Sequence, residues 1–587
     1  MASPDFGEWK NRLQKRGNMK YSLSTDTILA LAALLYFIDC SFEFLFDPDL
    51  FMLLRTGHEI LHHGFPYYDT FAWPPVWCKV PWVDYEWLSH VIIYIVYSAG
   101  GFAGTVIYKT FLYGVSFFVL FVWSKKKYGI RPALVALIIA IYLGRWFLSP
   151  RPMSYSAVIF PLLAFILLDL QQKPLTWKHF LLLPLIFVFW GNVHGAFIVG
   201  LVIMGAGFML LSYLQMKSHG RWKKMLLQFA LLWLLCFLAS VFINPYGLKN
   251  FIYCMDFLFF RPVFMNAASD MQSPFLRPAY NVHYFVITAL TLITLIFFIV
   301  RYRKIPSPME LLIYSVWLLA SFRAARNMQL FSTASIPVLS FLILQCSNLL
   351  AGNRYYLRLA SFLARKPALP DTAKVVALFT VLLFFIFSYV PVDFSGKTSE
   401  KDLFPVGMKD FLLHNDLPGR LYCHDIVGTY FLWYLYPRYQ VSLDVRWNNV
   451  YTDEYFREIQ SSFHNSDAFF RFVKKYEPEV VIIHYKYHPA FIENDQMWIL
   501  LYEGERSRLF LKKSEKNVEI IQRFERDLLW YPDIPDVNAF LFRTFIDRKN
   551  YRAAKKYLKR LILASPYEKE LWYYYRGLDR LIENKTE

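Results

Sequence analysis

The sequence predicts a polytopic α-helical membrane protein of about eleven transmembrane helices, with a C-terminal extracytoplasmic α/β domain and a tetratricopeptide-like helical tail. Three observations lead to this prediction. Of the 587 residues, 56% are hydrophobic and 19% are aromatic, which is unlike a soluble multidomain protein. Long apolar runs follow one another up to residue 391, with basic clusters between them. Beyond residue 391 the sequence changes to short alternating segments, which are typical of soluble α/β folds.

The apolar runs divide the chain into its membrane-spanning parts. The runs are 25–46, 102–123, 132–148, 153–170, 179–191, 196–214, 225–243, 284–300, 309–322, 328–348 and 374–391. We therefore expect a basic cytoplasmic N-terminus at 1–24 and a transmembrane domain over 25–391, with a long external loop at 47–101. The first run is longer than the apolar part of a signal peptide and no small-residue cleavage site follows it, so we expect a retained anchor.

Basic clusters set the expected topology. They fall on the N-terminus and on alternate turns, including Lys125–Lys127 and Arg301–Lys304, and the positive-inside rule places such turns in the cytoplasm. The turns that then face outward are 47–101, 149–152, 192–195, 244–283 and 323–327, together with everything after about 391. Flanking cations and lipid headgroups account for the net charge of +18, so we expect no nucleic-acid partner.

Several arginines lie on outward turns, where the positive-inside rule disfavours them. They are Arg145, Arg151, Arg261, Arg277, Arg323 and Arg326. A cation near the bilayer on the disfavoured side usually has an anionic partner and is a functional candidate. Pairing with local carboxylates or lipid phosphates is the alternative for each of them.

The external loop begins with acidic residues and continues into an amphipathic segment. Asp39, Glu43 and Asp47 are four residues apart, so they would form a carboxylate stripe on one helix, with Asp49 just beyond it. Over 50–63, apolar and polar residues alternate with helical spacing, and a glycine follows. We expect this segment to be a helix that lies in the membrane interface with its polar face exposed.

A zinc-protease signature falls on that helix. His58, Glu59 and His62 match H-E-x-x-H, which places both histidines on one helical face. Zinc catalysis also needs a third protein ligand and an open position for water. The extended motif supplies glycine and histidine where this chain has Phe65 and Tyr68, so a metalloprotease is the least favoured function. These three residues remain possible ligands of a divalent metal without protease chemistry.

Stretches along the chain resemble, in order, the GT-C glycosyltransferase superfamily, which includes protein O-mannosyltransferases and lipid A aminoarabinose transferases. The stretches are the loop 47–101, "SPRPMSY" (149–155), "WGNVHGAFIVG" (190–200), "INPYGL" (243–248), "RAARNMQLF" (323–331), "VGTYFLWYLYP" (427–437) and "VSLDVRW" (441–447). The resemblance covers most of residues 25–450. It implies a bacterial inner-membrane enzyme that transfers a sugar, with inversion, from a polyprenyl-phosphate carrier to a glycan, lipid or protein acceptor on the outer face.

The resemblance also implies site residues. The acidic pair after the first span carries the chemistry in this superfamily, which points to Asp47 and Asp49 as catalytic residues. Either carboxylate would act as a general base on the acceptor. Arg151, Arg323 and Arg326 would stabilise the departing phosphate as it gains charge.

Polar residues in tight outward turns are further substrate-binding candidates. Asn192, His194 and Asn244 could donate hydrogen bonds to sugar or phosphate, although a capping role is as good an interpretation for such turn residues. Asp84 and Glu86 are carboxylates that would orient the acceptor. Some GT-C members bind a metal in this loop, so a divalent cation is a possible cofactor.

The outer part is predicted as an α/β domain over 392–520 and a helical tail over 521–587. Strand-like runs are "GRLYCH", "YQVSLDV", "PEVVIIHY" and "RLFLKK", and the expected helices are "VGTYFLWYLY", "DAFFRFVKKY" and "PAFIENDQMWILLY". We interpret Asp444 and Arg446 as an ion pair at a strand end. The tail is too short for a stable repeat array, so we expect it to pack on the α/β domain or to bind a partner protein.

The sequence thus predicts a membrane glycosyltransferase that uses a polyprenyl-phosphate-linked sugar. The alternative is a non-catalytic protein that binds, flips or assembles lipid-linked glycans on the same scaffold. The zinc metalloprotease is the third possibility. The sugar, the acceptor and the choice between Asp47 and Asp49 stay open at this point.

Overall fold

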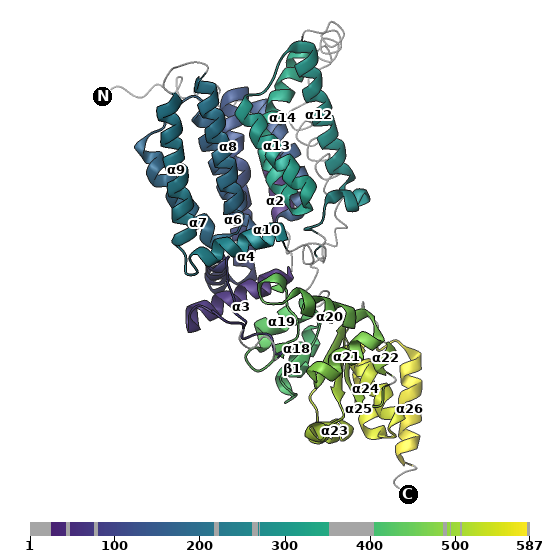
Figure 1. The fold of residues 1–587 in the computed structure, drawn as a ribbon. Coiled ribbons are helices and arrows are strands. Elements are labelled where there is room, and N and C mark those ends of the chain that lie inside the picture. The colour runs from purple at the N-terminus through teal and green to yellow at the C-terminus, as the bar shows by residue number, and fades with distance from the viewer. Residues whose placement is uncertain are drawn as a thin grey trace, which may run out of the picture.

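A helical bundle and an α/β domain lie end to end in the computed structural model (Figure 1). The structure describes residues 25–42, 47–74, 80–216, 222–260, 268, 270–351, 404–484, 490–493, 495–504 and 507–583. The N-terminus at 1–24, Glu43, Arg261 and the expected span 374–391 lie outside these residues.

Long apolar helices form the bundle. They are α2 (Thr25–Ser41), α4 (Trp87–Tyr128), α5 (Ile130–Gly144), α6 (Met153–Asp169), α7 (Trp177–Val193), α8 (Phe197–Met216), α9 (Trp222–Phe242), α12 (Val282–Tyr302), α13 (Pro308–Arg323) and α14 (Met328–Ala351). Each expected span from 25–46 to 328–348 coincides with one of these helices. By length and composition, six helices of the described chain can cross a membrane, and α6 and α7 are shorter apolar helices. The total of about eleven spans stays a prediction.

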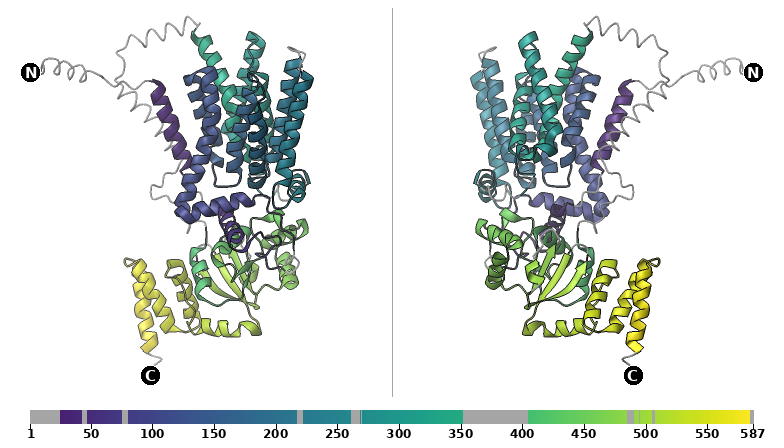
Figure 2. Two further views of the ribbon diagram at one scale, coloured as in Figure 1. Left: turned by 90° about the vertical axis from the view of Figure 1, so that its left-hand side faces the viewer. Right: turned by 90° about the vertical axis from the view of Figure 1, so that its right-hand side faces the viewer.

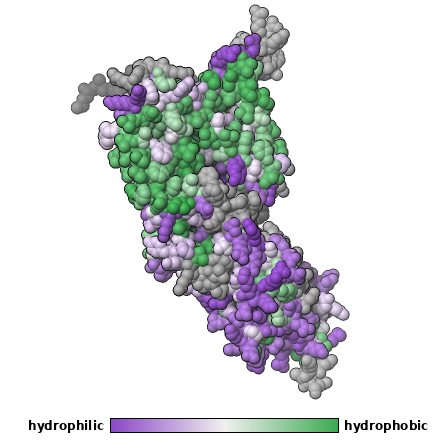
Figure 3. All heavy atoms as spheres, in the orientation of Figure 1, coloured by the Kyte–Doolittle hydropathy of each residue, from purple (hydrophilic) through white to green (hydrophobic). Residues whose placement is uncertain are grey.

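The surface of the bundle suits a lipid environment. Apolar side chains cover its visible face, whereas polar side chains cover the α/β domain (Figure 3). Large apolar side chains are strongly exposed, as at Val202 and Leu227, which are 64% and 70% exposed. Water would penalise such a surface and hydrocarbon would not.

Two helical segments at the end of the bundle that faces the outer domain were not predicted from the sequence. The sequence predicts a span at 102–123, but α4 begins at Trp87 and its first part runs across the end of the bundle (Figure 2). The change of direction occurs at Gly101, whose φ of 58° is readily adopted only by glycine. In addition, α10 (Leu248–Phe260) occupies part of the expected loop 244–283 and crosses the same end (Figure 1).

The helix predicted over 50–63 is α3 (Pro48–His63), and Gly64 ends it with a φ of 88°. The expectation of an exposed polar face is wrong for most of α3, because Arg55 and Thr56 are buried between the bundle and the outer domain, whereas His62 and His63 in the last turn are exposed. Leu53 and Leu54 belong to the core of the bundle. Phe51 belongs to the outer core, where its ring lies 5.0 Å from that of Phe404.

The outer domain is built on a five-stranded sheet of order β2-β1-β3-β5-β4. Its strands are β1 (Arg420–Tyr422), β2 (Gln440–Val441), β3 (Val480–His484), β4 (Trp498–Gly504) and β5 (Ser507–Lys512). β1 pairs in parallel with β2 and β3, whereas β5 pairs antiparallel with β3 and β4. The sequence prediction of a helix through "WILLY" is wrong, since those residues form β4; four adjacent apolar residues fit either periodicity.

Helices cover this sheet and continue into the tail. They are α18 (Val406–His414), α19 (Asp425–Leu435), α20 (Asp453–His464), α21 (Ser466–Tyr476), α22 (Ala490–Glu493), α23 (Val518–Glu525), α24 (Pro535–Asp547), α25 (Tyr551–Ala564) and α26 (Lys569–Glu583). Short 3₁₀ helices are η2 (Arg145–Phe147), η3 (Pro274–Leu276), η4 (Pro278–Asn281), η5 (Ala325–Asn327), η6 (Trp447–Asn449) and η7 (Glu515–Asn517). The tail packs on β4 through α24, and Phe540 and Leu541 share the core of the sheet.

The external loop joins the outer sheet beside β2. Trp73 N donates a hydrogen bond to Val441 O, and Val441 N donates one to Phe71 O, both at 3.2 Å. The Trp73 indole also donates to Leu421 O at 2.8 Å. Backbone pairing of this kind fixes the loop as an extra edge segment of the sheet.

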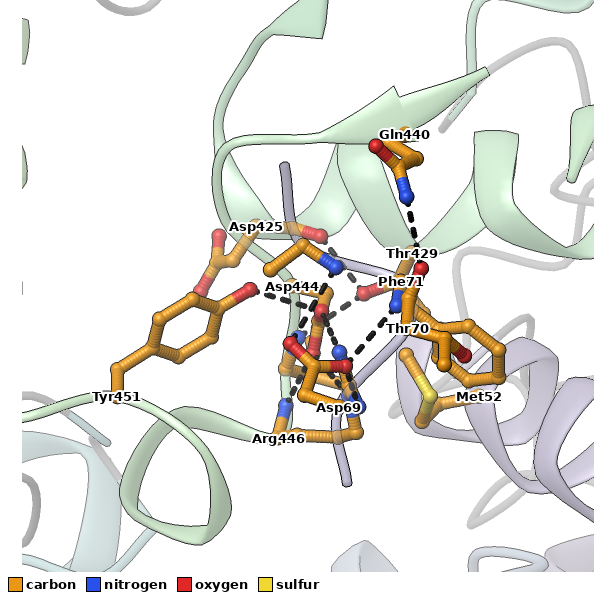
Figure 4. A network of polar contacts seen from close by, with 12 residues as sticks. Met52, Asp69, Thr70, Phe71, Asp425, Thr429, Gln440, Asp444, Arg446 and Tyr451 are labelled. Carbon is orange, nitrogen blue, oxygen red and sulfur yellow. Dashed lines mark hydrogen bonds and ion pairs between the residues drawn. The ribbon is translucent and has the colours of Figure 1, made fainter. Parts of the chain in front are cut away.

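A buried arginine reinforces this junction (Figure 4). Arg446 contacts Asp444 at 2.7 Å and, across the junction, Asp69 at 2.7 Å; the arginine side chain is 3% exposed and both carboxylates are 0% exposed. Its guanidinium carbon lies 4.7 Å from the ring centres of both Phe71 and Trp82. The ion pair expected at the end of β2 therefore extends to the external loop.

Candidate functional site

Charged side chains from separate turns meet at the end of the bundle that faces the outer domain. Arg151, in the turn before α6, lies 2.5 Å from Asp47 and 3.1 Å from Asp49. The same guanidinium lies 3.1 Å from Asp270, which is also 2.9 Å from Arg326. The expected outward turns 47–101, 149–152, 244–283 and 323–327 therefore converge on one cluster.

Other pairs tie together the opposite end of the bundle. Arg131 contacts Asp26 at 2.6 Å, and Lys127 contacts Glu310 at 2.8 Å. These residues come from the turns that the basic clusters assign to the cytoplasmic side. The contacts at both ends thus agree with the alternation of turns along the sequence.

Asp47 is held by two kinds of bond. It is the N-cap of α3, and its side chain accepts a hydrogen bond from Asp49 N at 3.1 Å. Its two carboxylate oxygens also accept hydrogen bonds from Arg151 Nε and Nη2, at 2.5 and 3.0 Å. With only 6% of its side chain exposed, Asp47 is an anchor that orients Arg151 and the start of α3.

Asp49 is the more accessible carboxylate of the pair. Its side chain is 34% exposed. Burial of the group in the crevice raises the pKa of Asp49 to about 6, and the nearby charges of Asp47 and Asp270 act in the same direction, although Arg151 opposes them. A carboxylate with this pKa is ionised at neutral pH and can still accept a proton readily.

Asp270 and Arg326 form a fixed pair. Arg326 N donates a hydrogen bond to Asp270 O at 2.9 Å, in addition to the side-chain contact. Burial opposes ionisation, but the guanidinium groups of Arg326 and Arg151 hold the pKa of Asp270 below its ordinary value. Arg326 Nε is buried and has no hydrogen-bond partner among the described residues. Arg323, the third predicted arginine, is exposed at the last residue of α13.

Glu86 and His194 form a second polar pair beside this cluster. His194 Nε2 lies 3.5 Å from Glu86 Oε1, and its Nδ1 lies 2.7 Å from Ser156 Oγ. Burial, followed by the charge of Arg326, lowers the pKa of His194 to about 3, so the ring is neutral. Burial, followed by the charge of Asp84, raises the pKa of Glu86 well above its ordinary value. Asp49 adds to this effect, which places both groups within electrostatic reach of the cluster.

The side chain of Asn192 forms hydrogen bonds within the protein. Its side-chain oxygen accepts a hydrogen bond from the Trp87 indole at 2.7 Å. Its amide donates to Val188 O at 2.7 Å and to Ile243 O at 2.8 Å. The bonds to Trp87 and Ile243 join α7 to the start of α4 and to the turn after α9, and the bond to Val188 O lies within the last turn of α7, as a capping role requires.

Asn244 and Asp84 are likewise engaged in local structure. Asn244 Oδ1 accepts from Tyr246 N at 2.9 Å, and its amide donates to Val241 O at 2.8 Å. Asp84 is fully buried, and its Oδ2 lies 2.8 Å from His90 Nδ1. We therefore interpret both as residues that shape the turns around the site.

An apolar groove of about 490 Å³ lies between the start of α4, the end of α7 and the turn after α9. It is lined by Trp87, Leu88, Leu185, Val188, Phe189, Asn192, Ile243, Asn244 and Pro245. Leu185 and Ile243 are 57% and 58% exposed on the face of the bundle. The groove thus opens on the apolar surface of the bundle, and Trp87 and Asn192 in its lining are close in sequence to Glu86 and His194.

The H-E-x-x-H residues are arranged differently from a protease centre. The rings of His58 and His62 are stacked, with centres 4.2 Å apart and planes inclined by 23°. A nitrogen ligand binds a metal in the plane of its ring, so two stacked rings cannot chelate one ion between them. His62 Nδ1 also donates to His58 O at 2.8 Å. Glu59 instead pairs with Arg55 and His63.

Asp270 was not among the predicted site residues. It is the only carboxylate in the sequence between Arg261 and His283, which is the signal that could have identified it. That segment has no recognisable motif, and its position next to Arg151 depends on tertiary structure. Asp69, which anchors the external loop, was missed for the same reason.

The fold and this cluster define a helical membrane protein with a charged site between its bundle and an outer α/β domain. No protein-family model and no curated protein matches the sequence. Solved structures do resemble it. One is the oligosaccharyltransferase AglB from Archaeoglobus fulgidus, with an inhibitory peptide and a dolichol-phosphate. The identity is 10%, the match covers 84% of this chain and 74% of that one, and the TM-score is 0.45.

A second similar structure is ArnT from Cupriavidus metallidurans bound to undecaprenyl phosphate. The identity is 12%, with 83% of this chain and 98% of that chain covered and a TM-score of 0.45. A further oligosaccharyltransferase structure from A. fulgidus, in complex with Zn and sulfate, is 13% identical. The match covers 78% of this chain and 68% of that chain, with a TM-score of 0.46. AglB and ArnT are glycosyltransferases of the GT-C superfamily that the sequence resembles.

Proposed function

We propose that the protein is a membrane glycosyltransferase that transfers a sugar from a polyprenyl-phosphate carrier to an acceptor molecule. The acceptor would bind next to Asp49. The observation that carries the proposal is the placement of Asp49. This carboxylate, which is 34% exposed and has a pKa of about 6, lies against Arg151 at the end of the bundle that faces the outer domain. The site therefore offers a base and cations side by side, which transfer from a phosphate-linked donor requires.

In the proposed reaction, Asp49 takes the proton of the acceptor hydroxyl or amine. The acceptor atom then forms a bond to the anomeric carbon as the bond from that carbon to the phosphate oxygen breaks, and the bonding pair leaves with the phosphate. Attack opposite the leaving group inverts the anomeric centre. Asp47 is the positioning residue, since both of its oxygens are occupied by Arg151.

The departing polyprenyl phosphate gains negative charge, which Arg151 and Arg326 are suited to bind. Arg326 Nε is a buried donor without a hydrogen-bond partner among the described residues, and an anionic oxygen would satisfy it. Asp270 holds the two guanidinium groups next to each other. A cation fixed in this way stabilises the transition state more than the less charged donor.

Glu86 and His194 are suited to the sugar. A carboxyl group and a neutral imidazole can both form hydrogen bonds with sugar hydroxyls. The apolar groove is open to the lipid-facing side of the bundle and would take the first isoprene units of the carrier. The head of the donor would then lie at Asp49 and its chain in the bilayer.

The test measures donor consumption by the purified protein in detergent, with polyprenyl-phosphate-linked sugars as donors and mass spectrometry of the extracted lipids as the readout. Loss of one general base should lower turnover about 10²–10⁴-fold in Asp49→Asn. The matched control is Asp26→Asn, which removes a carboxylate paired with an arginine at the opposite end of the bundle. Full turnover in Asp49→Asn, or equal loss in the control, would refute the proposed role of Asp49.

A further inference from the structure

The C-terminal half of α3 carries a group of side chains that the proposed transfer reaction does not use. His58, Glu59 and His63 each offer a ligand atom, and these atoms all lie within 4.8 Å of one another. We infer that these three side chains form a binding site for a transition-metal dication of the Zn²⁺ class, with water completing the coordination. The inference is independent of the proposed function.

The distances between the ligand atoms are close to those expected in a metal-bound site. His63 Nδ1 lies 3.0 Å from Glu59 Oε2, and His58 Nδ1 lies 3.8 Å from Glu59 Oε1. Two ligand atoms that bind one tetrahedral Zn²⁺ at about 2.1 Å are about 3.4 Å apart. The two observed separations lie on either side of this value and go to different oxygens of the Glu59 carboxylate, so side-chain rotations are needed to bring the three ligands onto one ion.

An unsatisfied polar atom points to a ligand at this position. His58 Nδ1 is buried without a hydrogen-bond partner among the described residues, whereas Glu59 Oε1 is in contact with Arg55 Nη2. The site also lies at the C-terminal end of a helix, where the helix dipole favours a cation.

Neighbouring residues hold the ligands in place. Arg55 stacks over the ring of Tyr436, 4.7 Å from its centre, while it pairs with Glu59. The ring of Tyr94 meets that of His58 edge-on at 5.4 Å. Such outer contacts orient a carboxylate and an imidazole for metal binding. Asp49 and Glu59 are ten residues apart on one helix, about 15 Å along its axis, so metal binding and sugar transfer are separable.

The ligand set differs from the sequence motif, and this difference provides the test. The H-E-x-x-H motif requires His62, whereas the structure assigns His63. Zn²⁺ binding to the purified full-length protein would be measured by isothermal titration after chelator treatment, and Co²⁺ absorption would report the coordination geometry. We expect one site per chain in the wild type and in His62→Ala.

Loss of a ligand should weaken binding more than the roughly 10- to 100-fold that loss of an outer contact costs. We therefore expect more than 100-fold weaker binding in His63→Ala and Glu59→Gln, with His179→Ala as the control at an exposed histidine elsewhere. His63→Asn serves as a second variant if the first is poorly folded by size-exclusion chromatography. Binding that survives in His63→Ala but is lost in His62→Ala, or no binding by the wild type, would overturn the inference.

Discussion

Replacing Arg446 with methionine should destabilise the outer part of the protein strongly. The substitution keeps most of the apolar volume but leaves Asp69 and Asp444, both 0% exposed, without their cation. Removing one partner of a buried ion pair costs about 3–5 kcal/mol, because the remaining charges stay buried. For a domain of 150–250 residues, each 1 kcal/mol lowers the Tm by about 2–4 °C, so the expected decrease is roughly 6–20 °C.

Thermal unfolding of the detergent-solubilised protein, followed by tryptophan fluorescence, measures this decrease. The matched control is Arg457→Met in the same domain, which removes an exposed ion pair between Arg457 and Asp453, 4.0 Å apart. This substitution should lower the free energy of unfolding by less than about 1 kcal/mol. Hydrogen exchange of the segment 67–74 should rise in Arg446→Met only. Equal midpoints for the two variants, or unchanged exchange of 67–74, would refute the assigned role of Arg446.

The pH dependence of this variant gives an independent check. Burial raises the pKa of Asp69, and Arg446 is the main group that opposes this effect. Without Arg446, the folded-state pKa of Asp69 moves further above the unfolded value. A raised carboxyl pKa favours the folded state at low pH, and that stability is lost as the pH rises through the folded pKa. The stability difference between Arg446→Met and the wild type should therefore be smaller at pH 5 than at pH 8.

Three further predictions concern the site and its supports. If Asp49 is the base, kcat/KM should fall about tenfold per unit below its pKa of about 6, because the protonated carboxyl cannot accept a proton; a flat profile from pH 4.5 to 7 would contradict this. Gly57→Ala should cost about 1–3 kcal/mol by thermal unfolding, since its new Cβ would lie 2.3 Å from His90 O between α3 and α4; a wild-type midpoint would show that the helices can separate at no cost. Asn192→Leu should lower stability by a similar amount through the loss of its bonds to Trp87 and the backbone, and donor binding should weaken no more than stability does; selective loss of binding would instead make Asn192 a ligand residue.

Hydrophobic periodicity was sufficient for much of the fold. The spans expected between 25 and 348 coincide with helices because a membrane helix must satisfy its backbone internally and therefore appears as one long apolar run. The same criterion misses helices that lie along the bundle end, such as α10 and the first part of α4. Those segments are too short or too mixed to stand out. The strand β4 was mistaken for a helix because most of its residues are apolar and buried, so the run shows no strict alternation of apolar and polar residues.

The site was predictable only where a residue type was unusual for its position. Arg151 and Arg326 stood out as arginines on outward turns, and Asp47 and Asp49 through the family resemblance. The structure brings these four together. Asp270 carried no comparable signal. The burial of α3 was also unpredictable, because its polar residues satisfy one another within the protein, as Arg55 and Glu59 do.

The position of α3 makes the site dependent on both parts of the molecule. At its start, Asp47 is fixed by Arg151, which belongs to the bundle. One turn later, Phe51 packs on Phe404 and Tyr430, two residues of the outer core. Their ring centres lie 5.0 and 5.2 Å from that of Phe51. A shift of the outer domain relative to the bundle would therefore move α3 and displace Asp49 from Arg151. The buried Arg446 junction and the strand-like pairing of the external loop with β2 oppose such a shift, so the outer domain stabilises the geometry of a site to which it contributes none of the clustered charges.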